Sequence, residues 1–168
     1  MRPDEEHRQH GPGVVRCFVL TVSDTRTEAT DTGGRAVAEL LASAGHHVVG
    51  RAIVRDDAAV VRSAVETQIA SAGVDAVITT GGTGITSRDT TYEAVAALLE
   101  KRLDGFGELF RMLSYEQIGA AAMMSRATAG LARGHIIIVL PGSEAAVRLA
   151  MEKLVIPELG HLIQQARR

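Results

Sequence analysis

The sequence is poor in aromatic residues, cysteine and lysine. Only 3% of its 168 residues are aromatic and tryptophan is absent, so the core must consist mainly of small aliphatic side chains. Cores of this kind are typical of tightly wound α/β sheets. The single cysteine, Cys17, excludes an intramolecular disulfide. Because free cysteine usually lies in the core, we interpret Cys17 as a buried small hydrophobe rather than a nucleophile.

Long apolar runs and an excess of basic charge are also lacking. No segment approaches the roughly 18 apolar residues of a membrane helix. The net charge of -2 and the pI near 6.3 provide no basic field, so neither nucleic acid nor a membrane is expected as a partner. Residues 1–13 are charged and polar, which indicates a disordered lead-in rather than a secretory signal peptide. We therefore expect a cytoplasmic location.

The remaining residues, 14–168, are expected to form one domain. Apolar and β-branched runs predict four strands, at residues 14–22, 46–54, 74–79 and 135–140. Helical spacing predicts helices at residues 36–44, 58–72, 91–101 and 108–118, with a break at 104–107. Residues 120–126 are compatible with either a loop or a short helix. A last helix is expected to begin after Ser143, to run towards Gln165, and to be kinked or divided at Pro157.

This alternation of strands and helices predicts a largely parallel sheet with helices on both faces. One loop of that sheet, residues 80–89, carries three glycines in four positions directly after an apolar strand. Such a loop leaves backbone N–H groups facing an anion, and Arg88 and Asp89 close it. It matches neither the P-loop nor the dinucleotide-binding pattern. The alternative interpretation is a flexible turn.

Further polar segments are expected beside this loop. In open parallel sheets, ligands bind outside the carboxyl ends of the strands. Asp24 follows the first predicted strand, Asp57 follows the second, and Pro141-Gly142-Ser143 follows the last. Carboxylates beside a phosphate site imply Mg²⁺, and that combination suits phosphoryl or nucleotidyl transfer. The alternative is that Asp57 only caps its helix and Asp24 only shapes a turn.

Three other polar features have two interpretations each. Ser143 is either an anion contact at a helix N-terminus or a simple N-cap. Ser125 and Arg126 offer a hydroxyl and a bidentate anion contact, although a surface arginine is the default. His46 and His47 are rejected as a metal-binding pair, because adjacent strand residues point to opposite faces.

These blocks together resemble a known family. They are Leu20-Thr21-Val22-Ser23-Asp24, Thr80-Gly81-Gly82-Thr83-Gly84 with Arg88-Asp89, Ser125-Arg126-Ala127 with Ala129-Gly130, and Pro141-Gly142-Ser143. In this order and spacing, they identify the chain as a member of the MoaB/MogA family of molybdenum cofactor biosynthesis proteins, to which the plant Cnx and animal gephyrin G domains are related. Residues 44–49 and 105–115 look more like the MoaB type than the MogA type.

The resemblance implies a three-layer αβα sandwich with a mostly parallel sheet, assembled as a homotrimer or homohexamer. It implies adenylylation of molybdopterin by Mg-ATP with release of pyrophosphate, and possible contact with other enzymes of the pathway. Two alternatives are a non-catalytic molybdopterin-binding or assembly protein and a scaffold module with a vestigial pocket.

The family pattern also assigns roles to residues of this chain. Asp89 and Asp57 are expected to be catalytic, and Asp24 and Asp57 to hold Mg²⁺. The residues expected to bind ATP or molybdopterin lie in the glycine loop and in two later segments: Thr80, Gly81, Gly82, Thr83, Gly84, Arg88, Ser125, Arg126, Pro141, Gly142 and Ser143.

Overall fold

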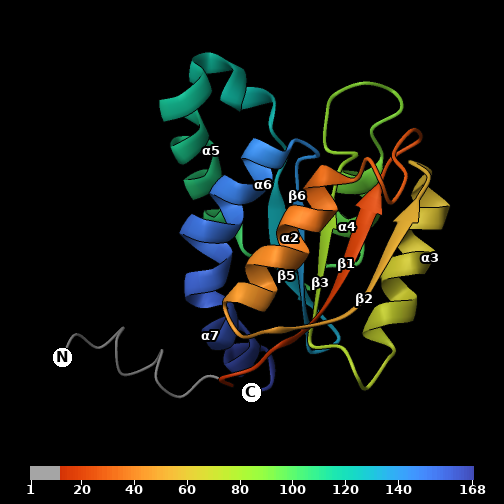
Figure 1. The fold of residues 1–168 in the computed structure, drawn as a ribbon, viewed down its shortest axis with the longest axis vertical. Helices are drawn as coiled ribbons and strands as arrows, with labels where there is room; N and C mark the ends of the chain where they lie inside the picture. The colour runs from red at the N-terminus through yellow and green to blue at the C-terminus, as the bar shows by residue number, and fades with distance from the viewer. Residues whose placement is uncertain (1–11) are drawn as a thin grey trace.

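A six-stranded sheet runs through the part of the chain that the computed structural model describes, residues 12–168. Its strands are β1 (Arg16–Val22), β2 (His47–Val54), β3 (Ala76–Thr80), β4 (Lys101–Arg102), β5 (Thr128–Ala132) and β6 (His135–Leu140), in the spatial order β2-β1-β3-β6-β5-β4 (Figure 1). The first four strands of this order pair in parallel, whereas β5 and β4 are antiparallel to their neighbours. The mostly parallel sheet is therefore confirmed. The expected lead-in, residues 1–13, lies outside the described residues apart from its last two.

Helices cover both faces of the sheet. One layer contains α2 (Thr32–Ser43), α5 (Asp104–Ile118), α6 (Glu144–Ala150) and α7 (Ile156–Ala166), and the other contains α3 (Ala58–Ile69) and α4 (Thr91–Ala96) (Figure 1). The expected three-layer arrangement is confirmed. Among the described residues, no helix has the length and apolarity needed to cross a membrane.

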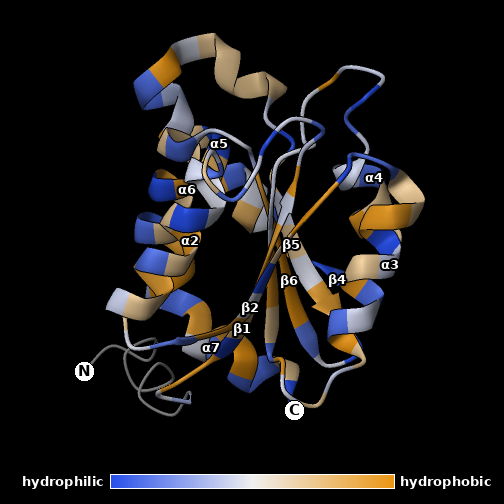
Figure 2. Cartoon of the chain, turned by 45° about the vertical axis from the view of Figure 1, so that its right-hand side comes forward, coloured by the Kyte–Doolittle hydropathy of each residue, from blue (hydrophilic) through white to orange (hydrophobic). Residues whose placement is uncertain are grey.

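Each layer packs on its own apolar core, because neighbouring strand residues point to opposite faces. Val19, Ile78 and Ile138 belong to the cluster under α2, α6 and α7. Their neighbours Leu20 and Ile137 belong to the cluster under α3 and α4. The central strands are buried on both sides, which explains why they are apolar along almost their whole length (Figure 2).

The antiparallel edge of the sheet was not predicted. The helix expected to reach Lys101 ends as α4 at Ala96, and Lys101 and Arg102 form the short strand β4. Strand β5 was missed because Thr128–Ala132 consists mostly of small residues with no clear alternation. It is joined to β6 by Arg133 and Gly134, which have φ angles of 49° and 78°. Two consecutive positive φ angles are typical of a tight hairpin turn.

The expected break at residues 104–107 was wrong, because α5 begins at Asp104. Glycines in this segment suggested the break, but Gly107 serves packing: a Cβ there would lie 2.7 Å from the carbonyl oxygen of Ala127. Residues 120–126 were left open between loop and short helix, and most of them belong to a 3₁₀ helix, Gly119–Met124.

The predicted division of the last helix is confirmed. A π-helical turn, Met151–Val155, separates α6 from α7. Pro157 lies in the first turn of α7, directly after this π-helical turn.

Candidate functional site

A cavity of about 460 Å³ lies at the carboxyl ends of β1, β3 and β6. This is the edge at which parallel sheets bind ligands. Loops far apart in the chain line it: Thr21, Val22, Ser23, Asp24, Arg26, Asp31, Asp56, Thr80, Gly81, Gly82, Arg88, Asp89, Gly142 and Ser143. The structure thus brings together most of the polar segments that the sequence predicted at this rim.

The glycine loop adopts backbone angles that require glycine at two positions. Gly81 and Gly82 have φ angles of 96° and 68°, in the left-handed region. A Cβ at Gly81 would also collide with the carbonyl of Val22. The N–H of Gly81 donates to the carbonyl of Leu140 at 3.0 Å, so this N–H is not available to an anion. Gly81 therefore anchors the loop to β6.

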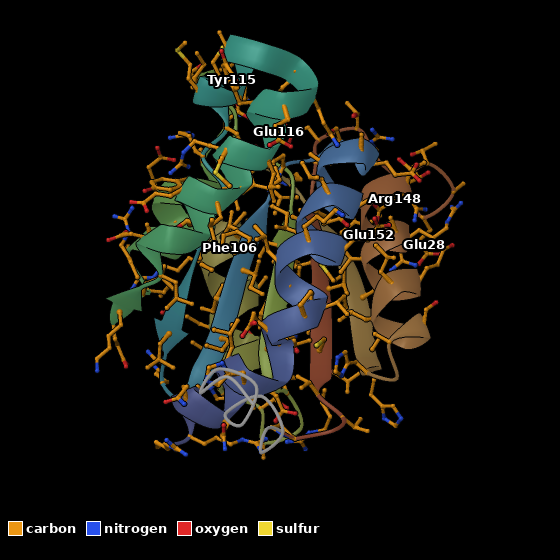
Figure 3. The ribbon with its side chains drawn as sticks, turned by 90° about the vertical axis from the view of Figure 1, so that its left-hand side faces the viewer. Glu28, Phe106, Tyr115, Glu116, Arg148 and Glu152 are labelled. Carbon is orange, nitrogen blue, oxygen red and sulfur yellow. The ribbon has the colours of Figure 1, made fainter. Side chains whose placement is uncertain are left out.

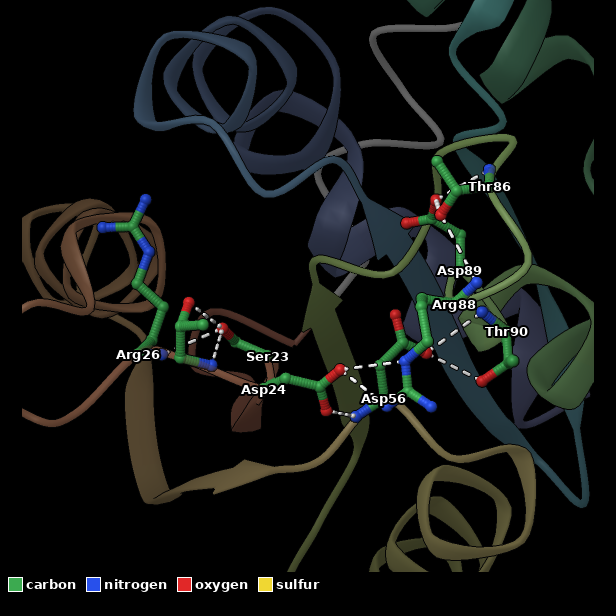
Figure 4. A network of polar contacts seen from close by, with 9 residues as sticks. Ser23, Asp24, Arg26, Asp56, Thr86, Arg88, Asp89 and Thr90 are labelled. Atoms are coloured by element: carbon green, nitrogen blue, oxygen red, sulfur yellow. Dashed lines mark hydrogen bonds and ion pairs between the residues drawn. The ribbon is translucent and has the colours of Figure 1, made fainter.

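Asp24 and Arg88 both line the cavity and are bonded to each other (Figure 4). Arg88 donates to Asp24 Oδ2 from Nη2 at 2.7 Å and from Nε at 3.3 Å. The other carboxylate oxygen accepts from the backbone N–H of Asp56 at 3.1 Å. These bonds, that from Arg88 above all, hold the pKa of Asp24 below its ordinary value. Asp24 is therefore a fixed anion, paired with an arginine whose side chain is 70% exposed.

Asp56 lines the cavity and Asp57 does not. The Asp56 side chain is buried, and its Oδ1 accepts from Thr90 N at 3.0 Å and Thr90 Oγ1 at 2.7 Å, so it holds the far end of the glycine loop. Asp57 instead caps α3, accepting from the N–H groups of Ala59 and Val60. The capping interpretation of Asp57 is confirmed, and the aspartate that faces the cavity is its neighbour.

Asp89 is held within its own loop. Its Oδ2 accepts from Thr86 N at 2.9 Å and from Thr86 Oγ1 at 2.5 Å (Figure 4). The Thr86 hydroxyl bond is the main cause that lowers the pKa of Asp89, and the charge of Arg126 adds to it. Asp89 is therefore an oriented carboxylate in the cavity wall.

A second, mainly apolar cavity of about 310 Å³ adjoins the first. Both are lined by Gly142 and Ser143, and Ser143 also caps α6 through the N–H of Ala146. The other lining residues come from the glycine loop, from α5 and the segment that follows it, from the end of β6 and from α6: Thr83, Gly84, Phe110, Ser114, Ile118, Met124, Ser125, Pro141 and Ala146. A polar chamber and an apolar chamber therefore meet at residues 142–143.

The predicted binding residues divide between these two chambers. Thr80, Gly81, Gly82 and Arg88 line the polar one, whereas Thr83, Gly84, Ser125 and Pro141 line the apolar one. Arg126 lines neither cavity, because its guanidinium donates to carbonyls of the glycine loop. Its role as an anion contact stays a prediction.

The carboxylates of the polar cavity are candidate ligands for a metal ion that is bound together with a phosphate. Asp24, Asp56 and Asp89 all line it. Within residues 12–168, however, no three His, Cys, Asp or Glu side chains are grouped closely enough to hold a metal by themselves. Mg²⁺ commonly takes only one or two protein carboxylates and completes its shell with substrate phosphates and water.

Comparison with known proteins identifies the family. The family model described as "Probable molybdopterin binding domain" matches residues 18–161. The chain belongs to this molybdopterin-binding domain family. Molybdenum cofactor biosynthesis protein B of Bacillus cereus is 52% identical over 164 residues, which cover 97% of each chain. The protein of the same name from Bacillus subtilis is 49% identical over 165 residues, covering 98% of this chain and 97% of its own.

Solved structures of the family show the same fold. A crystal structure of molybdenum cofactor biosynthesis protein B superposes with a TM-score of 0.91 at 51% identity, covering 95% of this chain and 99% of its own. The tungsten cofactor synthesizing protein MoaB from Pyrococcus furiosus superposes with a TM-score of 0.84 at 41% identity, covering 94% of this chain and 99% of its own. A MogA structure gives 0.79 at 33% identity, with coverage of 90% and 99%. The predicted family, with its relation to both MoaB and MogA, is confirmed.

Two acidic residues of the cavity in this family member were missed from the sequence. Asp56 was passed over for the adjacent Asp57, which has the clearer capping position. Asp31 was not predicted as a site residue, yet it is buried and accepts from Thr21 Oγ1 at 2.8 Å and from Arg51 at 3.2 Å. Asp31 stands just before the helix that contains Gly33 and Gly34, which is a typical N-cap position, and its side chain accepts from the N–H of Gly34. This position could have been used to predict its place at the rim.

Proposed function

We propose that this chain binds molybdopterin and adenylylates it with Mg-ATP, releasing pyrophosphate. The observation that carries the proposal is the meeting of a polar and an apolar cavity at Gly142 and Ser143. A molecule with a phosphate at one end and a flat ring system at the other matches these two chambers. Family membership supports molybdopterin as that molecule, and the related proteins are named for molybdenum cofactor biosynthesis.

The reaction joins two phosphates. An oxygen of the terminal phosphate of molybdopterin attacks the α-phosphorus of ATP, and the bond from that phosphorus to the oxygen bridging to the β-phosphorus breaks. Pyrophosphate leaves with the electron pair. Catalysis of this kind depends mainly on positioning and on neutralising charge.

The residues of the polar cavity supply these two effects. The glycine loop brings backbone close to the phosphates, and Arg88 exchanges its bond with Asp24 for a bond with a phosphate oxygen. Mg²⁺, when bound, neutralises charge on the phosphates, and Asp24 and Asp56 are the carboxylates best placed to hold it. Asp89 is the carboxylate that orients the reacting groups from the loop.

The second cavity binds the ring system of molybdopterin. Ser125 and Pro141 line it together with apolar side chains of α5. Burying the ring system there aligns the terminal phosphate with the polar cavity across Gly142 and Ser143. This separation of ring and phosphate sites is what the reaction needs, because the ring must stay anchored while the phosphate reacts.

Purified protein incubated with molybdopterin and Mg-ATP tests the proposal. We expect pyrophosphate and an adenylylated pterin from the wild type. Asp89→Ala should abolish turnover and keep pterin binding. If the wild type binds the pterin but forms no product, the enzyme proposal is wrong. The alternative is then a non-catalytic molybdopterin-binding or assembly protein.

We also propose that the protein assembles as a homotrimer or homohexamer. Exposed apolar side chains gather on α5 and the 3₁₀ helix, where α5 projects beyond its layer (Figure 3): Leu109, Met112, Tyr115, Ile118, Met123 and Met124. Contiguous exposed apolar residues commonly mark an interface. Light scattering coupled to size-exclusion chromatography measures the mass directly, and a monomer at micromolar concentration would contradict the assembly.

A further inference from the structure

Arg126 lies between the 3₁₀ helix and β5, and two of its three guanidinium nitrogens, Nε and Nη2, reach the glycine loop. Nε donates to the carbonyl of Thr83 at 3.2 Å. Nη2 donates to the carbonyls of Gly84 and of Asp89, the latter at 3.4 Å. Nη1 pairs with the carboxylate of Glu93. One side chain thus connects both ends of residues 83–89 with the start of α4.

The guanidinium is also held on its face. It stacks over the ring of Tyr92, with 5.2 Å between Arg126 Cζ and the ring centroid. Contacts of this kind are favourable by about 0.5–1 kcal/mol or more. The Arg126 side chain is only 26% exposed. Edge and face contacts together leave it little freedom to turn towards a ligand.

Arginine suits this position for a physical reason. Residues 83–89 form no regular helix or strand, so their carbonyls find few partners in a backbone ladder. A buried carbonyl without a donor costs about 1–3 kcal/mol. Arginine presents five N–H donors in one rigid plane, whereas lysine presents a single point charge. Only the planar group can serve carbonyls at both ends of the loop.

We propose that Arg126 is a positioning residue that fixes residues 83–89 and thereby aims Arg88 and Asp89 into the polar cavity. It acts through the loop and does not itself contact the ligand. The structural part of this inference stands on the carbonyl contacts alone. Its consequence for turnover rests on the proposed function.

Hydrogen exchange of the ligand-free protein tests the structural part. Arg126→Lys and Arg126→Ala should both raise the exchange rate of the loop amides by about tenfold or more. Arg102→Ala is the matched control, because Arg102 stacks on the same Tyr92 ring at 5.7 Å and donates to its hydroxyl. In that control we expect exchange in the loop to stay at the wild-type rate.

Two exchange results would overturn the inference. One is wild-type protection of the loop in Arg126→Ala. The other is an equal loss of protection in Arg102→Ala, which would assign the effect to Tyr92 packing. Thermal melts of all variants establish that each is folded before exchange is compared.

Kinetics then separate positioning from anion contact. A displacement of the loop by about 1 Å should lower kcat about 100-fold in Arg126→Lys. The KM for ATP should stay within about threefold of the wild type, since uniform binding is unchanged. A raised KM with unchanged kcat would instead make Arg126 a ligand contact and overturn the proposal. If the wild type shows no turnover, the proposed function fails and the exchange experiment still decides the role of Arg126.

Discussion

The adjacent residues Asp56 and Asp57 offer a matched pair for separating stability from activity. Asp57→Ala removes the cap of α3, where the carboxylate accepts from the N–H groups of Ala59 and Val60. Loss of an N-cap costs about 1 kcal/mol in the free energy of unfolding. For a domain of this size, that corresponds to a fall in Tm of roughly 2–4 °C. Turnover measured well below Tm should be unchanged.

Asp56→Asn should differ by lowering turnover as well as stability. The substitution keeps the shape of a buried side chain but removes its charge, which weakens two hydrogen bonds to Thr90. Bonds to charged groups exceed neutral ones by about 1 kcal/mol each, so the loop loses about 2 kcal/mol of its anchoring. If the full loss appears in the transition state, kcat/KM falls about 30-fold. The same loss of about 2 kcal/mol lowers the free energy of unfolding, so Tm should fall as well, by roughly 4–8 °C.

Pyrophosphate release and thermal unfolding followed by circular dichroism measure the two effects on the same samples. Molybdopterin binding, measured in parallel, shows whether a loss of turnover reflects a loss of ligand. The reasoning is refuted if Asp57→Ala loses turnover at an unchanged Tm. Wild-type turnover in Asp56→Asn would refute it equally.

Three further predictions concern stability and reactivity. Burial opposes ionisation of Asp75, but bonds from two arginines lower its pKa to about 2. The ionised side chain therefore contributes about 2 kcal/mol to the free energy of unfolding above pH 4, and this contribution is lost as the pH falls towards 2. Acid titration of Asp75→Asn should lack that loss. Burial raises the pKa of Cys17 to about 12, so a thiol reagent at pH 8 should label it only after unfolding in urea. Gly81→Ala should lower Tm, because the φ of 96° at Gly81 and the nearby Val22 carbonyl exclude a Cβ. Gly105 lies in a helix with open space around it, so Gly105→Ala should raise the free energy of unfolding by about 0.5–1 kcal/mol. Thermal melts measure both effects.

Apolar strands of the parallel half could be predicted because burial on both faces leaves long aliphatic runs. β6 was predicted at its observed bounds, since His135–Leu140 contains five consecutive large aliphatic residues after its first position. β5 has no such run, and its alanines and glycine carry no pattern. Gly130 is small for packing, because a Cβ there would approach Leu99 at 2.9 Å. Only the neighbouring elements show that β5 is a strand.

The site could be predicted at the level of loops rather than of side-chain direction. Strand ends and glycine content were sufficient to place the loop and Asp24 at one rim. The choice between Asp56 and Asp57 depends on which way the backbone turns after β2, and the spacing of residues in the sequence does not predict that direction. The same limit applies to Arg126, whose partners in the glycine loop are backbone carbonyls more than 35 residues away in sequence.

The strand order has a consequence for the chain during its synthesis. β3 lies between β1 and β6, and every residue of β3 is buried in the finished sheet. Until β6 has emerged from the ribosome, one edge of β3 has no partner, and an open apolar edge invites pairing with other chains. The same event completes the ligand site, since Gly81 N bonds Leu140 and Thr80 Oγ1 donates to Pro141. A nascent chain that ends before β6 therefore carries the glycine loop without its anchor, and it has an unpaired apolar strand edge in place of a binding site.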